Sequence, residues 1–168
     1  MKTVALLSLL VIGCVPPPPP GVTSWDAGTL QLGVALSDSD PKFVAMPKDV
    51  ELHAGAQGGF HVPVMYQVTG EREDKALFEH TVRRSRDMAL VSRGSRTLDV
   101  SGSPWVTSQP IPTFMCPTPV GINIIGEELI FEVTVTSSVG VILSRETAKT
   151  SLHCPMANTD FCESICKG

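Results

Sequence analysis

Short runs of alternating apolar and polar residues recur along the chain from residue 29 onward. The clearest runs cover residues 29–34, 60–68 and 129–136. Successive side chains of a β-strand point to opposite faces of its sheet, so alternation is typical of a strand with one buried face. Four apolar positions in the last run are therefore expected to face a core: Leu129, Phe131, Val133 and Val135.

Shorter segments between turn-forming residues carry the same pattern less clearly. They are residues 50–53, 80–83, 87–91, 97–100, 122–124 and 139–150. Seven to nine strands at this spacing predict an all-β fold, namely an immunoglobulin-like antiparallel β-sandwich, with a β-barrel as the alternative. Only residues 72–80 and the last ten residues have a helix-like composition.

One proline falls inside a strong strand pattern. Pro63 stands in the middle of the run 60–68. Proline has no N–H group to donate to the hydrogen-bond ladder of a sheet, and it is found mainly on edge strands and at bulges. The sequence therefore predicts an edge position or a bulge at Pro63.

The N-terminus carries the only long apolar run. Residues 3–12 are apolar apart from Thr3 and Ser8 and follow a single Lys2. Ten helical residues rising about 1.5 Å each are too short for a hydrocarbon core of about 30 Å. A short apolar run after a positive start is instead typical of a secretory signal peptide.

The end of this run resembles the lipobox of bacterial lipoproteins. The residues are Val11-Ile12-Gly13-Cys14, with branched apolar residues, a small residue and then cysteine. The resemblance implies cleavage before Cys14, a diacylglycerol thioether on its sulfur and further acylation by chains such as palmitate. Several acyl chains hold a protein stably on a membrane. The alternative is an ordinary signal peptide with an incidental cysteine.

Residues on either side of this cysteine define three parts of the chain. Residues 1–13 form the expected signal peptide, residues 14–28 the lipidated cysteine and a tether, and residues 29–168 the β-sandwich domain. The five prolines at 16–20 favour a stiff polyproline II segment of roughly 15 Å. Val15 in place of aspartate implies, by resemblance to Gram-negative lipoproteins, the outer membrane. The domain would then lie in the periplasm or at the cell surface.

The remaining cysteines lie in the last third of the chain. They are Cys116, Cys154, Cys162 and Cys166, an even set that predicts two disulfides in an exported domain. Three connectivities are open. The alternative is a four-thiolate zinc site, but zinc ligands usually come as two close pairs. The disulfides are expected to staple the C-terminal tail to the sandwich.

Two histidines flank a glycine-rich segment between two strand candidates. His53 and His61 enclose three glycines within five residues, at positions where a backbone turn is easily made. Histidine is a ligand for copper, so these two residues are the candidates for a metal site. The simpler interpretation is a hairpin loop with two partly exposed histidines and no metal. The stretch 57–61 (QGGFH) also resembles uncharacterised predicted lipoproteins of myxobacteria, a resemblance that implies no chemistry.

Composition and motifs narrow the function class. The net charge is −4 and only 18% of residues are charged, so no basic face for nucleic acid is expected. The sequence has no GxSxG, HExxH or GxxxxGK[ST] motif, and neither catalytic activity nor a cofactor is expected. The cluster at 83–86 (RRSR) is expected to be a solvated turn.

Together these features predict a membrane-anchored envelope lipoprotein. Its role is expected to be non-catalytic, as a binding or interaction module for an envelope protein or a glycan, with the lipid anchor as its contact with the membrane. The alternative is a periplasmic lipoprotein that handles copper or another metal through His53 and His61.

Overall fold

The structure is a computed structural model. It describes residues 29–35, 41–69, 73–101, 104–137 and 142–168. The expected signal peptide, the lipidation of Cys14 and the tether at 14–28 lie outside the described residues, so they stay predictions.

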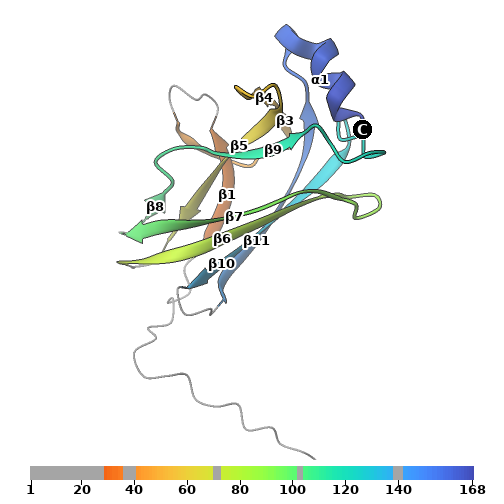
Figure 1. Cartoon of the computed structure of the whole chain (residues 1–168). Coiled ribbons are helices and arrows are strands. Elements are labelled where there is room, and N and C mark those ends of the chain that lie inside the picture. The colour runs from red at the N-terminus through yellow and green to blue at the C-terminus, as the bar shows by residue number, and fades with distance from the viewer. Residues whose placement is uncertain (1–28, 36–40, 70–72, 102–103, 138–141) are drawn as a thin grey trace, which may run out of the picture.

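The described chain is built almost entirely of strands, arranged in two sheets (Figure 1). The first sheet has β5 at its centre, with β1 and β4 on one side and β8 and β9 on the other, and β2 beyond β1. Its strands are β1 (Leu30–Ala35), β2 (Phe43–Ala45), β4 (His53–Ala54), β5 (Phe60–Val68), β8 (Trp105–Val106) and β9 (Ile111–Cys116).

The second sheet has the order β3-β11-β10-β6-β7. Its strands are β3 (Asp49–Glu51), β6 (Glu73–Arg84), β7 (Leu90–Ser101), β10 (Glu128–Ser137) and β11 (Ile142–His153). All pairs are antiparallel except β3 with β11. A 3-10 turn, η1 (Met156–Asn158), and a helix, α1 (Thr159–Cys166), end the chain. Within the described ranges, no helix is both long and apolar enough to cross a membrane.

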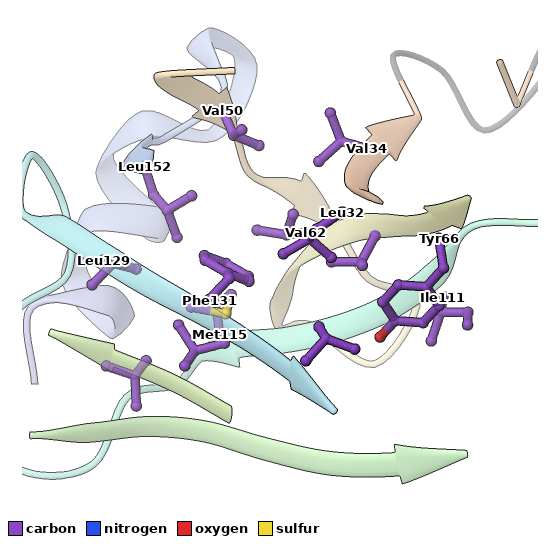
Figure 2. Packing of buried hydrophobic residues seen from close by; sticks show 14 of the residues in the cluster. Leu32, Val34, Val50, Val62, Tyr66, Ile111, Met115, Leu129, Phe131 and Leu152 are labelled. Carbon is purple, nitrogen blue, oxygen red and sulfur yellow. The ribbon is translucent and has the colours of Figure 1, made fainter. Parts of the chain in front are cut away.

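The alternating residues of β5 and β10 fill the space between the sheets (Figure 2). The four predicted core residues of β10 are each at most 1% exposed: Leu129, Phe131, Val133 and Val135. Their counterparts on β5 are Phe60, Val62, Val64 and Tyr66, which are equally buried. Burying one such side chain contributes about 1.5–3 kcal/mol. The all-β prediction with a two-sheet core is confirmed.

Residues 72–80 contradict their helix-like composition. From Glu73 onward they belong to β6, which is paired with β10 on one side and β7 on the other. Ala76 and Phe78 are buried, whereas the intervening Leu77 and Glu79 are only partly buried. The two-residue spacing of the buried positions and the pairing on both sides outweigh the helix propensity of the charged residues.

Two other strand assignments were wrong in detail. Residues 87–91 and 97–100 are not separate strands: the first is the turn and start, and the second the end, of the single strand β7. Residues 122–124 form no strand. Ile124 is fully buried, but the chain turns directly after it, where Glu127 N–H donates to the Ile124 carbonyl and Gly126 has a φ of 73°.

Pro63 lies in the central strand rather than on an edge. Pairing with β1 begins at Val64 and pairing with β4 ends at His61, so neither strand pairs with Pro63 on that side. On the other side Pro63 stands opposite Pro112 of β9. A bulge in this pairing occurs between Phe60 and His61, not at the proline. The missing donor of Pro63 is thus tolerated at a break in the ladder.

Two disulfides hold the C-terminal helix against the sandwich. Cys116 at the end of β9 is bonded to Cys166, and Cys154 after β11 is bonded to Cys162. The prediction of two bridges is confirmed, and the structure selects one connectivity of the three. Because both bridges end in α1, they fix an eight-residue helix that would be too short to persist alone.

The arginine cluster at 83–86 is not uniformly solvated. Arg84 is only 5% exposed and donates two hydrogen bonds to the carboxylate of Asp87, from Nε to Oδ1 at 3.0 Å and from a terminal nitrogen to Oδ2 at 2.6 Å. This contact lowers the pKa of Asp87 to about 2. A third donor of Arg84 reaches the carbonyl of Asn123 at 3.2 Å. The cluster therefore closes the β6–β7 turn instead of forming a basic patch.

Candidate functional site

The glycine-rich segment forms the predicted tight loop between two paired strands. His53 of β4 stands directly opposite His61 of β5, and their ring centroids are 6.0 Å apart. The loop closes through the Gly55 N–H, which donates to the Gly59 carbonyl at 2.7 Å. Gly58 has a φ of 81°, a conformation that side chains disfavour, so the glycine composition has a local cause.

The structure places the two imidazoles of the metal alternative next to each other. Among the described residues, the one group of three or more His, Cys, Asp or Glu side chains close enough to share a metal is Cys154, Cys162 and Cys166. Those sulfurs are bonded in the two disulfides. His53 and His61 remain a pair that lines the outer face of the first sheet.

Phe114 is the most prominent residue that the sequence did not single out. It lies on β9 and is 56% exposed, and its ring centroid is 5.9 Å from that of His61. It borders three adjoining cavities of about 390, 310 and 290 Å³. A large aromatic side chain that stays exposed beside cavities indicates an interaction site more strongly than a single apolar residue elsewhere on the surface.

The first of these cavities lies over the glycine-rich loop. Its lining combines Phe114 and His61 with two prolines of the β9 segment and two side-chain amides, Gln57 and Gln109. The third cavity extends from Phe114 toward Val91 and Cys116. Phe114 is therefore the shared wall of a surface that runs along the outer side of β9.

The second cavity opens between the edge strands β7 and β9, and we call it the edge cleft. β7 is the edge strand of the second sheet, and β9 lies at the edge of the first sheet, where it pairs with β5. The cleft therefore opens between the edges of the two sheets. Figure 1 shows β9 and β7 next to each other on this side. Its lining consists of Tyr66, Phe78, His80, residues 92–96, Ile111, Pro112 and Phe114.

The floor of the edge cleft is aromatic. The rings of Tyr66 and Phe78 stack with centroids 4.9 Å apart, and Trp105 packs behind Phe78 at 5.6 Å. Figure 2 shows Tyr66 among the core side chains, with its hydroxyl directed away from β5. Burial raises the pKa of this hydroxyl well above its ordinary value, so Tyr66 stays a neutral phenol.

His80 is a polar residue on the inner face of β6. It stands opposite the buried Val133 on one side and Gly94 on the other, between Phe78 and Val82 along the strand. Burial lowers the pKa of its imidazole below the ordinary 6.5. A Cβ atom at Gly94 would lie 2.6 Å from the Cε1 atom of His80, so the imidazole occupies the space that the glycine leaves.

One arginine side chain stands at the mouth of the cleft. Arg96 faces inward on β7, opposite the buried Phe78, whereas Arg93, opposite Thr81, faces the outer side of the sheet, where it lines another cavity together with Glu79 and Glu132. The Arg96 guanidinium makes no ion pair or side-chain hydrogen bond within the described part of the chain. The lining of the edge cleft contains no acidic residue. The cleft therefore combines an aromatic floor, a neutral imidazole and an uncompensated positive mouth.

Of this arrangement, the position of His80 follows from the sequence pattern. His80 follows Phe78 and precedes Val82 at two-residue spacing, which places a histidine on the core face once β6 is recognised. The helix-like composition of 72–80 hid that spacing. The sequence around Phe114 and Arg96 does not predict their exposure, because their exposure depends on which strands lie next to them in the fold.

Comparison with known proteins identifies no relative of this chain. No protein-family model matches the sequence, and no curated protein is similar enough to count as a match.

The pKa of His80 makes stability depend on pH. Between the lowered folded value and 6.5 the unfolded chain binds more protons, so stability falls as the pH drops through this range. We expect His80→Gln to lose less stability than the wild type between pH 7 and pH 5, measured by urea unfolding. Equal losses for both proteins would show that His80 is not held neutral by the fold.

Proposed function

We propose that this protein is an exported, lipid-anchored and non-catalytic binding module whose partner contacts the β9 side of the sandwich. The observation that carries the proposal is the environment of Phe114, which is 56% exposed and borders three cavities. Exposed aromatic side chains beside cavities are typical of interaction sites, because they bury a large apolar area at a small entropic cost.

The two disulfides support the export part of the proposal. Disulfides persist in oxidising compartments and are rare in the cytosol. Cys116–Cys166 and Cys154–Cys162 use all four cysteines of the domain, which leaves Cys14 as the fifth. Cys14 is the last residue of the lipobox-like sequence. Because it has no cysteine left for a disulfide, we assign it to lipid attachment.

The fold supports an orientation in which the C-terminal helix lies at the end of the domain that is distant from the lipid anchor. β1 begins with Leu30, which pairs with Val68 at the end of β5. The Cys116–Cys166 bridge attaches α1 to the part of β9 that pairs with Phe60, at the start of β5. Eight residue steps of about 3.3 Å separate these ends by about 26 Å. A tether attached before β1 would leave α1 and the glycine-rich loop facing outward.

A photo-crosslinking amino acid at position 114 tests the proposed surface. In cells of the native organism, we expect replacement of Phe114 by a benzophenone residue to give a discrete crosslinked band after irradiation. The matched control is Phe161, an aromatic residue of α1 that is 52% exposed and lines none of the three cavities. Bands of equal intensity from both positions, or none from position 114, would contradict the proposal.

The anchor has a separate test in Cys14→Ser. Serine has no thiol to accept diacylglycerol, so we expect the variant to accumulate as the unprocessed precursor or to leave the membrane pellet. The measurement is an immunoblot of membrane and soluble fractions together with the mass of the N-terminal peptide. Normal processing with unchanged pelleting would rule out the lipobox interpretation.

A further inference from the structure

We propose that the edge cleft between β7 and β9 binds a small organic carboxylate whose apolar body lies in the cleft against β9 and whose charge contacts Arg96. This inference deepens the proposed function, because it names the ligand chemistry of one part of the Phe114 surface. The argument depends on the floor, the mouth and the two edges of the cleft.

The floor selects an apolar body. A volume of about 310 Å³ falls at the small end of the range for ligand cavities. The stacked rings of Tyr66 and Phe78 form the base of the cleft but are each only 1% exposed, so the accessible apolar surface comes mainly from Phe114 and Pro112. Such a space fits an aromatic ring or a short aliphatic chain in contact with Phe114.

The mouth selects a negative charge. Arg96 is exposed, lines the cleft and has no acidic neighbour in its lining. A guanidinium presents its N–H donors in a planar fork that matches the two oxygens of a carboxylate. The chain as a whole carries a net charge of −4, so an acid-free positive mouth is a local exception. Charge complementarity therefore favours an anion here.

His80 adds a polar contact deep in the cleft. Its imidazole lies between the apolar floor and Gly94, with its pKa lowered by burial. A neutral imidazole offers one donor and one acceptor nitrogen. Together with the Tyr66 hydroxyl, it supplies the few convergent polar groups that usually fix the orientation of a small ligand in an apolar site.

The edges favour a small molecule over an added peptide strand. Strand addition requires backbone N–H groups along an open edge. Pro110 and Pro112 remove two such donors from the β9 segment that borders the cleft. Inward-pointing charges such as Arg96 are a further device that blocks pairing at the β7 edge. The cleft is thus open to a ligand at a position where a strand pairs poorly.

The test is a titration with 3-phenylpropionate. The protein is residues 15–168, without Cys14 and the expected signal peptide, exported behind a cleavable signal sequence so that both disulfides form. Its histidines are labelled with ¹³C, and the Cε1 signal of His80 is followed by NMR. We expect a saturable shift with a Kd of a few millimolar, which is the affinity of a fragment with about 11 non-hydrogen atoms.

Matched probes and variants identify the groups that bind. The uncharged amide, 3-phenylpropionamide, should bind about tenfold more weakly than the acid does, and the acid should bind about tenfold more weakly to Arg96→Gln than to the wild type. The control is Arg145→Gln, which removes an exposed arginine of β11 that does not line the cleft. Its affinity for the acid should equal that of the wild type.

The outcomes separate this inference from the proposed function. No saturable shift, equal affinity for acid and amide, or equal weakening by Arg145→Gln would each overturn the carboxylate site. A crosslink at position 114 together with a flat titration would overturn the ligand chemistry and leave the interaction surface standing. A selective titration without any crosslink would support the carboxylate site and contradict a partner on the β9 side.

Discussion

The hydrophobic layer between β5 and β10 is the constraint on which the rest of the structure depends. Each strand is central in its sheet, and β5 contributes five side chains and β10 four to the same core. Because the core side chains of each strand lie on one face, the register of every neighbouring strand is fixed by which face it must bury. A slip of one residue in β6 would expose Phe78 and Val82 and bury charged residues instead.

The same constraint leaves two edges open. The two sheets contact each other through side chains, so the edge strand β7 and the neighbouring β9 are close without pairing to each other. Inner-face positions near these edges need not be apolar, and His80 and Arg96 occupy two of them. The edge cleft therefore forms because the two sheets do not pair at this edge. Its polar side chains are residues that the hydrophobic core does not require.

The sequence predicted the parts of the fold that depend on alternation alone. The boundaries of β5 and the buried face of β10 were correct, and so was the number of disulfides. Residues 72–80 were assigned wrongly, because propensity is local whereas pairing with β7 and β10 is not. The disulfide connectivity and the exposure of Phe114 depend on which distant segments become neighbours, and spacing along the chain does not encode that.

The central claim is that the β7 edge is unpaired beside the cleft. Hydrogen–deuterium exchange of residues 15–168, resolved by residue with NMR, measures this directly. We predict that every second amide between Ser92 and Thr97 exchanges rapidly, whereas the amides of β10, bonded on both sides, are protected to near the global free energy of unfolding. Uniform protection of residues 92–97 would show that the edge is covered and would contradict an open cleft.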